Sequence, residues 1–401
     1  MFPVSQKIRW LVDCDSFYAS CEIYLNPKLR WLPVCIWWDI VIARSYQAKA
    51  YGIKVGTPIR EAKKLLPKNA VFLPPRITHY WQISHTLMAY LHEKCNEVEV
   101  FSIDEAFFEI SWYSEIYNLS YAEIARRMKH DIYKKIWIPV SIWIWPTKLL
   151  AKMFAEVNKP YWELVCLAKK DIDMTLQSLP LAHIPFIWPK TQEKLRYVCT
   201  TAYDYTSLSY AYIRDLLGKN WLNIWLELNC INAMTLGNKK KPKSIHRTRS
   251  FNPHFTSDKD ILWSRLLDNI DKACEHLLDV HMATTYIAIS FRTKDFHRFS
   301  LDTKLPYPTN DKLFITKTAK TLFESMTIGS IVFRTTWMYL WNLVDMHHLQ
   351  TSLFTPHTAR KNNDALNTII HTINKKYWRG TVRLWEAKQT QQKNTIFELE
   401  V

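Results

Sequence analysis

Acidic side chains occur at two places in the sequence where an apolar run ends. Asp13 and Asp15 follow the run IRWLV, and Asp104 and Glu105 stand between the apolar runs VEVFSI and AFFEI. Carboxylates crowded at neighbouring strand ends repel one another unless divalent cations neutralise them, and Mg²⁺ prefers oxygen ligands of this kind. The pattern predicts a site for phosphoryl transfer with two metal ions. For any one acid the simpler interpretation is a cap on a strand or turn.

The charge of the chain indicates a polyanionic partner. Its 53 lysines and arginines exceed its 37 acids by a formal charge of +16, and the pI is about 9.3. Such an excess favours nucleic acid as the partner. A basic protein without a nucleic-acid partner is the alternative interpretation.

Length and composition exclude several classes of protein. With 401 residues, 48% of them apolar, the chain can form two to four packed domains, because single cores stop growing beyond roughly 250–300 residues. It has no run near the ~20 apolar residues of a membrane span and no signal peptide, which predicts a cytoplasmic protein without membrane contact. The eight cysteines form no C-x-x-C pair, so we expect reduced, mostly buried thiols.

Apolar periodicity predicts the elements that position the acids. Residues 8–13 predict a buried strand, and the runs beside Asp104 and Glu105 predict strands that meet near a hairpin tip. Residues 58–66 and 147–158 predict helices, the second with Lys148 and Lys152 on one face. Residues 171–235 predict a small all-α module, 237–243 a linker, and 244–345 an α+β domain.

Four segments, in this order, resemble motifs of the Y-family translesion DNA polymerases. They are LVDCDSFYASCE, PVCIWWDIVIARSYQAKAYGIKVGTPIREAKKLLP, VEVFSIDEAFFEI and PVSIWIWPTKLLAKMFAEVNKP. The segment IPFIWPKTQEKL resembles the helix-hairpin-helix of the family's thumb, and KSIHRTRSF resembles the start of its little finger. Agreement of several motifs in order is more specific than any single motif. QTSLF and ALNTIIHTINKKYWRGTVRL resemble the UmuC branch, the catalytic subunit of DNA polymerase V, more than DNA polymerase IV.

The resemblance implies an α+β multidomain fold, the right-hand polymerase with palm, fingers, thumb and little finger. The implied ranges are 1–25 and 76–170 for the palm, 26–75 for the fingers, 171–235 for the thumb with its helix-hairpin-helix, 236–243 for a linker, 244–349 for the little finger, and 350–401 for a tail with a clamp-binding peptide.

The resemblance also assigns catalytic roles. The metal ligands fall on Asp13, Asp104 and Glu105, with the main-chain carbonyl of Cys14 as a further ligand. All three acids are present, so the resemblance implies an active enzyme with two Mg²⁺ ions. These ions hold the incoming triphosphate, lower the pKa of the primer 3′-hydroxyl and stabilise the leaving pyrophosphate.

Four further residues match the nucleotide contacts of the family. Tyr46, Lys49 and Lys159 match the groups that bind the triphosphate, although Lys49 cannot bind it bidentately as the more common Arg does. Tyr18 matches the steric gate, an aromatic ring beneath the sugar that leaves no room for a 2′-hydroxyl. Without the resemblance, the sequence would predict that Tyr18 is an aromatic residue packed in the core.

The remaining implied contacts are with DNA and with other proteins. A helix-hairpin-helix binds a DNA phosphate through main-chain N–H groups. The peptide QTSLF matches the Q-x-x-L-F form of a sliding-clamp peptide, and an ordinary loop is the alternative. An accessory subunit like UmuD and a recombinase filament are further expected partners. The implied contact residues are Ile187, Trp188, Lys190, Thr191, Arg247 and Arg249 for DNA, and Gln350, Leu353 and Phe354 for the clamp.

The function that these assignments predict is error-prone translesion synthesis, adding dNTPs to a primer opposite damaged template in an SOS-type response to DNA damage. Two alternatives remain. One is a catalytically idle, clamp-tethered DNA-binding protein, which the intact acids disfavour. The other is a two-metal repair nuclease, which has no need of Tyr18, Tyr46 or Lys49.

Glycine and tryptophan are used in an unusual ratio. The chain has 6 glycines and 18 tryptophans, whereas glycine is usually about 7% of a protein. Many tryptophans stand in Pro-flanked turns, where a Cβ is unfavourable. We hypothesise that the source reads the UGA codon as glycine and that the printed sequence translates it as tryptophan. The candidates are Trp31, Trp37, Trp112, Trp137, Trp143, Trp145, Trp162, Trp188, Trp337 and Trp378, with Phe186 also at a glycine position, whereas Trp225 and Trp263 fit helices.

Overall fold

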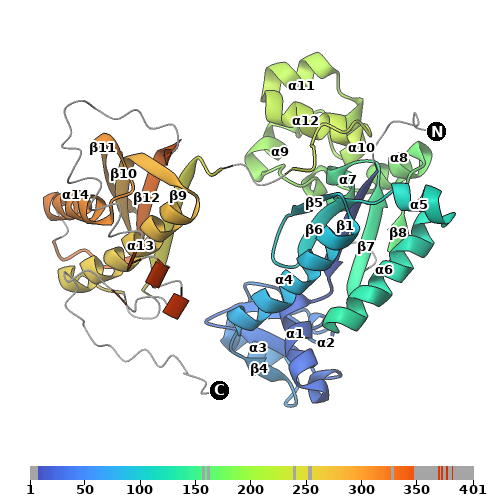
Figure 1. Cartoon of the computed structure of the whole chain (residues 1–401). Helices are drawn as coiled ribbons and strands as arrows, with labels where there is room; N and C mark the ends of the chain where they lie inside the picture. Colours follow the sequence, from blue (N-terminus) through green and yellow to red (C-terminus); the bar gives the residue numbers. More distant parts are fainter. Residues whose placement is uncertain are drawn as a thin grey trace. The chain divides into compact units, whose positions relative to one another are not determined.

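The chain divides into two compact units, Met1–Lys239 and Lys240–Val401, which Figure 1 traces. The computed structural model describes residues 8–155, 159, 163–237, 241–251, 255–326 and 329–346, with seven more between 369 and 382. The boundary between the units lies within the segment 236–243 that the sequence predicts as a linker.

A five-stranded sheet in the order β5-β6-β1-β7-β8 forms the centre of the first unit. The central strand β1 pairs antiparallel with β6 and β7, and all six of its residues are buried. Trp10 and Val12 belong to the core on one face and Leu11 to the core on the other, so both faces of the strand are apolar. The strands are β1 (Arg9–Cys14), β5 (Glu97–Val100), β6 (Glu105–Glu109), β7 (Val140–Trp145) and β8 (Glu163–Val165).

Helices supply the apolar partners of this sheet. α1 (Phe17–Leu25), α4 (Ile77–Lys94) and α6 (Tyr121–Ile136) contribute to the core that contains Trp10, and α5 (Trp112–Tyr117) packs beside α6. α6 begins with a capping box made by Ser120 and Glu123. On the other face lies α7 (Lys148–Met153), which is shorter than the predicted helix over 147–158.

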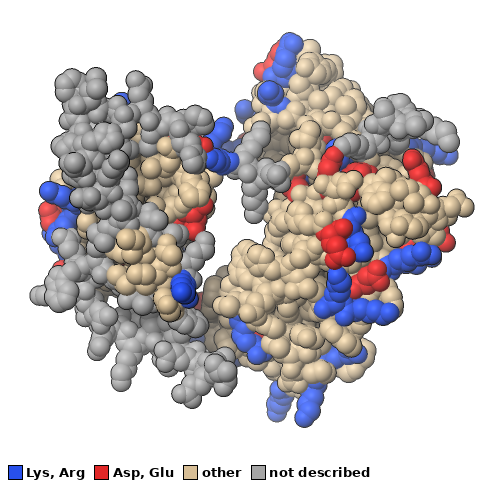
Figure 2. Space-filling view, viewed as in Figure 1, with Lys and Arg blue, Asp and Glu red and all other residues tan. Residues whose placement is uncertain are grey.

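Residues 26–75 form a three-stranded sheet, in the order β3-β2-β4, with short helices. Nine lysines and arginines and two acids fall in this range, and Figure 2 shows basic side chains gathered at the lower end of the first unit. The elements are η1 (Pro27–Leu29), β2 (Val34–Trp37), β3 (Val41–Arg44), α2 (Tyr46–Lys49), α3 (Ile59–Leu65) and β4 (Val71–Leu73).

The range 171–235 is helical throughout its named elements, as its sequence predicts. Its apolar residues share a core with α7 and with Leu11 of β1. The elements are α8 (Lys169–Ser178), η2 (Leu181–His183), α9 (Pro189–Leu195), α10 (Ala202–Ser207), α11 (Tyr210–Leu217) and α12 (Lys219–Leu228).

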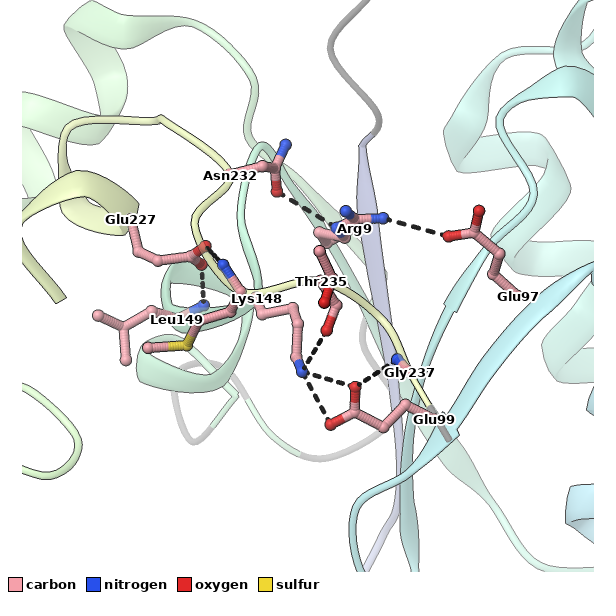
Figure 3. A network of polar contacts seen from close by, with 10 residues as sticks. Arg9, Glu97, Glu99, Lys148, Leu149, Glu227, Asn232, Thr235 and Gly237 are labelled. Atoms are coloured by element: carbon pink, nitrogen blue, oxygen red, sulfur yellow. Dashed lines mark hydrogen bonds and ion pairs between the residues drawn. The ribbon is translucent and has the colours of Figure 1, made fainter. Parts of the chain in front are cut away.

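A polar network attaches the last segment of the first unit to its sheet (Figure 3). The buried carboxylate of Glu227 accepts hydrogen bonds from three main-chain N–H groups at 2.7–3.1 Å, one of them from Leu149. Lys148 donates to both oxygens of Glu99 at 2.8 and 2.7 Å, and the N–H of Gly237 donates to Glu99 at 3.2 Å. The chain that leads into the linker is therefore held to β5 and α7.

The second unit is a four-stranded sheet in the order β11-β10-β12-β9 with two helices on one face. This matches the α+β domain predicted from residue 244. Its other face carries half-buried aromatic rings, among them the stacked pair Tyr286 and Trp341. The elements are β9 (Ser244–Ser250), α13 (Lys259–Asp279), β10 (Met282–Thr293), β11 (Arg298–Thr309), α14 (Lys312–Ser325) and β12 (Phe333–Asp345).

The tryptophans differ in whether their indole N–H is satisfied. Among the described residues, four candidates for glycine have a buried indole N–H with no hydrogen-bond partner, namely Trp37, Trp112, Trp143 and Trp145. By contrast, the N–H of Trp225 donates to two carbonyls at 3.1 and 3.0 Å, and that of Trp10 donates to Ser111 at 3.5 Å.

Backbone conformation marks two more of the candidate positions. Trp137 has φ 58° at the C-cap of α6, a left-handed position where glycine is strongly favoured. Phe186 has φ 72° in the turn before α9. Trp31 and Trp188 are 79% and 70% exposed, and Trp162 and Trp378 lie outside the described residues.

The sequence predicts no membrane span and no disulfide bonds, and both can be compared with the described part of the chain. No helix there is long and apolar enough to cross a membrane. The eight cysteines, all described, are free thiols, and seven of them are buried, as the sequence predicts.

Candidate active site

The acids at the two strand ends meet across the junction of β1 and β6. In the antiparallel register, Asp13 lies directly opposite Glu105. The N–H of Cys14 donates to the carbonyl of Asp104 at 2.9 Å, which ties the turn between β5 and β6 to the end of β1. The structure confirms the predicted hairpin and places Asp13, Asp104 and Glu105 in one neighbourhood.

Asp15 lies on the same edge but has a different environment. It is 1% exposed, and its Oδ1 accepts hydrogen bonds from Ser141 Oγ at 2.9 Å and from the Tyr46 hydroxyl at 3.3 Å. The carboxylate therefore links the turn between β1 and α1 to β7 and holds Tyr46 near the strand ends. The acid pattern includes Asp15 among the crowded carboxylates, and the resemblance assigns it no metal. In the fold it supports Tyr46.

Two lysines neutralise the buried carboxylates. Lys159 Nζ lies 2.8 Å from Asp13 Oδ1, so a predicted triphosphate contact and a predicted metal ligand are neighbours. Lys152 Nζ donates to both oxygens of Glu105 at 2.8 and 2.7 Å. Sequence reasoning missed this role of Lys152, although its predicted place on one face of a helix was a signal.

Burial and mutual repulsion raise the proton affinity of these acids. Burial raises the pKa of Asp13 to about 7, Lys159 opposes that rise, and the negative charges of Asp104 and Glu105 add to it. Burial also raises the pKa of Glu105, against the attraction of Lys152. A site that concentrates negative charge in this way favours cations.

The donor set fits Mg²⁺ in its chemistry. Within the described residues, no three His, Cys, Asp or Glu side chains form a ready-made metal site. Lysines pair with Asp13 and Glu105, and the Ser102 hydroxyl donates to Asp104. The acids nevertheless offer hard carboxylate oxygens close enough for their charges to interact, which is the ligand type that Mg²⁺ requires. Asp13, Asp104 and Glu105 are the residues that could hold such ions.

The predicted nucleotide contacts surround this edge. Tyr18, in the first turn of α1, is half-buried and stacks on Tyr80 with ring centroids 4.4 Å apart. Tyr46 begins α2, and the exposed Lys49 ends it, with its Nζ 5.7 Å from the Tyr46 ring. Sequence reasoning missed Tyr80, because nothing in α4 marks that tyrosine apart from other core aromatics.

The predicted DNA contacts in the range 171–235 lie at the start of α9. Trp188 precedes the helix, and Trp188 and Lys190 are exposed. Ile187 and Thr191 are 4% and 9% exposed, so their side chains pack inward and only their main-chain groups could contact DNA. The assignment of these residues to DNA stays a prediction.

The two arginines predicted to contact DNA from the second unit point toward α13. Arg247 Nη2 lies 2.9 Å from His276 Nδ1, and Arg249 pairs with Asp268 at 2.6 Å. They lie opposite the buried Met338 and Thr336 in the strand register, hence on the helix-covered face. Their DNA contact stays a prediction that this orientation does not support. Gln350, Leu353 and Phe354 lie outside the described residues.

Two family models match the chain. The impB/mucB/samB family matches residues 12–156, and the C-terminal domain of the same family matches residues 242–353. Together the two models cover more than half of the chain, including every predicted metal ligand.

Individual relatives agree with the family models. The chain is 28% identical over 378 residues to a DNA polymerase IV of Desulfatibacillum aliphaticivorans, covering 92% of this chain and 94% of that protein. It is 35% identical over 221 residues to a DNA polymerase IV of Saccharolobus solfataricus, covering 52% of this chain and 61% of that one.

Solved structures show the same similarity. A Y-family DNA polymerase chimera of Dbh and Dpo4 matches with a TM-score of 0.70 and 26% identity, over 84% of this chain and 99% of that chain. An insertion ternary complex of Dbh DNA polymerase matches with a TM-score of 0.57, also at 26% identity and over the same shares.

Proposed function

We infer that this chain, which belongs to the Y family of DNA-directed DNA polymerases, performs translesion synthesis by adding dNTPs to a primer 3′ end opposite damaged template. The observation that carries this inference is the meeting of Asp13, Asp104 and Glu105 where β1 ends and β6 begins. These acids fall inside the segment that matches the family model.

The side chains around these acids suit nucleotidyl transfer. Two Mg²⁺ ions held by Asp13, Asp104 and Glu105 would lower the pKa of the primer 3′-hydroxyl and stabilise the leaving pyrophosphate. Lys159 and Tyr46, placed by their contacts with Asp13 and Asp15, supply donors for phosphate oxygens. The basic excess of residues 26–75 would attract a triphosphate to the first unit.

The branch and the wider partners form the finer part of the proposal. The relatives named above are DNA polymerase IV proteins, whereas the UmuC-like features lie in 350–401, most of which is outside the described residues. An SOS-type role, a sliding clamp, a UmuD-like subunit and a recombinase filament are therefore proposed from the sequence.

Primer extension with Mg²⁺ and a single dNTP tests the proposed function. We expect addition of one nucleotide on undamaged template and on template carrying a lesion. An idle DNA-binding protein would bind the primer-template without extending it, and a repair nuclease would shorten one strand. Either result would overturn the proposal.

Replacing the proposed steric gate should weaken the discrimination between sugars. We expect Tyr18→Ala to raise the rNTP-to-dNTP ratio of kcat/KM by about 10–200-fold, the range for a lost steric contact in a pocket, because the ring no longer fills the space beneath C2′. Tyr18→Phe keeps the ring and serves as the control. An unchanged ratio in Tyr18→Ala would make Tyr18 an ordinary core aromatic.

The proposed clamp peptide can be tested separately from the chemistry. We expect Leu353→Ala with Phe354→Ala to leave single-nucleotide insertion unchanged and to remove stimulation by the sliding clamp, since losing apolar anchors typically costs more than about 1–2 kcal/mol and tethering raises the local concentration of enzyme. Thr351→Ala with Ser352→Ala changes the neighbouring positions and is the matched control. Equal clamp stimulation of the anchor variant and the unmodified protein would reduce QTSLF to a loop.

A further inference from the structure

The ring of Tyr18 rests on a second aromatic ring that is fully buried. Tyr80, on α4, is 0% exposed, and its ring plane lies 22° from that of Tyr18 at a centroid distance of 4.4 Å. Phe17 meets Tyr80 edge-on at 6.4 Å. Tyr18 therefore has a flat partner on one side, and turning its ring away would break a stacked contact.

Hydrogen bonds to a buried carboxylate hold this partner in place. The Tyr80 hydroxyl donates to Glu22 Oε1 at 2.6 Å, and Glu22 is 0% exposed on α1, one turn after Tyr18. Arg76, just before α4, donates to the same carboxylate through Nε at 3.0 Å and through Nη2. The fork of Arg76 and the hydroxyl of Tyr80 thus satisfy the charge of Glu22.

The contacts connect two helices around one ring. Glu22 and Tyr18 belong to α1. Tyr80 belongs to α4, and Arg76 is the N-cap residue just before that helix. Burial, with the hydrogen bond to Glu22, raises the pKa of Tyr80, so the hydroxyl keeps the proton that it donates. One face of the Tyr18 ring therefore packs on Tyr80, and Glu22 holds the Tyr80 hydroxyl.

We propose that Tyr80, held by Glu22 and Arg76, is a positioning residue for sugar selection: it supports the Tyr18 ring at the height at which that ring excludes a 2′-hydroxyl. The proposal rests on the proposed function, in which Tyr18 is the steric gate. It assigns no contact with the nucleotide to Tyr80 itself.

The test compares variants that remove the stack, the hydrogen bond or neither. Tyr80→Leu fills the site with an apolar side chain but removes the ring that stacks on Tyr18. Tyr80→Phe keeps that ring and removes the hydrogen bond to Glu22. Tyr90→Leu changes another buried tyrosine of α4 and is the matched control. For each variant, kcat/KM is measured for one rNTP and the matching dNTP on the same primer-template. A purely structural role would lower both values together.

We expect Tyr80→Leu to raise the rNTP-to-dNTP ratio by about tenfold and Tyr80→Phe by a smaller factor, in line with the worth of an aromatic pair, and Tyr90→Leu to leave the ratio unchanged. If Tyr80→Leu does not fold, an elevated ratio in Tyr80→Phe supports the proposal and an unchanged one overturns it. If folded Tyr80→Leu leaves the rNTP-to-dNTP ratio unchanged while Tyr18→Ala raises it, the proposal for Tyr80 is refuted and the assignment of Tyr18 as the gate stands. Unchanged ratios in both refute the gate as well.

Discussion

Asp104→Ala is expected to abolish nucleotide incorporation while DNA affinity stays nearly constant. The substitution removes one of the three carboxylates proposed to hold the metal ions, and losing several kcal/mol of transition-state stabilisation lowers the rate by about a thousandfold or more. DNA affinity depends mainly on basic contacts with phosphates, and the substitution leaves these in place. Single-turnover incorporation and primer-template binding, measured in the same buffer, separate the two effects.

The contacts of Asp104 indicate that Asp104→Ala would lose incorporation through the chemistry and not through unfolding. The contact that ties Asp104 to β1 is made by its main-chain carbonyl, which accepts from the N–H of Cys14 and survives any side-chain replacement. Within the described chain, the Asp104 side chain accepts a hydrogen bond from the nearby Ser102 hydroxyl. The fold should therefore tolerate the change.

Two further variants control this experiment. Asp104→Asn keeps the size and one acceptor oxygen but removes the charge, so it should be nearly as inactive as the alanine variant. Asp215→Ala removes an exposed carboxylate paired with Arg214 on α11 and should retain full activity. Incorporation by Asp104→Ala at the unmodified rate, or a parallel loss of DNA binding, would contradict the assigned role.

The positions of the acids could be predicted because they depend on short-range patterns. Buried strands read as apolar runs, and acids that interrupt such runs must lie at strand ends. The predicted hairpin joins β5 to β6. The register that sets Asp13 opposite Glu105 belongs instead to the pairing of β1 with β6, two strands distant in sequence, and the hairpin does not fix it. The partners of Glu105 and Tyr18 are harder to predict, because Lys152 and Tyr80 reach them from helices distant in sequence.

The orientation of Arg247 and Arg249 shows a second limit. The resemblance to the start of the family's little finger places Arg247 and Arg249 in the correct strand. Side chains alternate between the two faces of a sheet, however, so a shift of one residue moves a side chain to the opposite face. In β9 both arginines fall on the face covered by α13, and His246 and Thr248 fall on the other. To know which face of the sheet a residue occupies, one must know how the strand pairs with its neighbour, and the sequence alone does not give that pairing.

The tryptophan content yields the second large prediction. A buried indole N–H usually finds a partner, and leaving a buried donor unsatisfied costs about 1–3 kcal/mol. Four of the candidate tryptophans have such an orphaned N–H in the described chain, and Trp137 adds a left-handed backbone that costs a side chain roughly 1–2 kcal/mol. These penalties fall on positions that the sequence predicts to be glycine.

The two interpretations of these residues predict opposite signs for the same substitution. If tryptophan is native, replacing it with glycine leaves a cavity that costs about 3–5 kcal/mol per buried ring. If glycine is native, a gene encoding glycine at 37, 112, 137, 143 and 145 gives a protein more stable by several kcal/mol than the printed sequence. Urea unfolding of the two proteins decides between them, with Trp10→Gly, at a position with a satisfied N–H, as a variant that destabilises under both.

The protein made by its natural source gives the most direct result. Trypsin cleavage after Lys135 and Lys148 releases residues 136–148, IWIPVSIWIWPTK, which contain Trp137, Trp143 and Trp145. Reading of UGA as glycine predicts the mass of this peptide with glycine at all three positions. The peptide of residues 10–28 begins with Trp10 and should keep tryptophan, because its indole is satisfied and its ring fills the core beside Phe108. Tryptophan masses at 137, 143 and 145 would show that the orphaned indoles belong to the native protein and would end the recoding hypothesis.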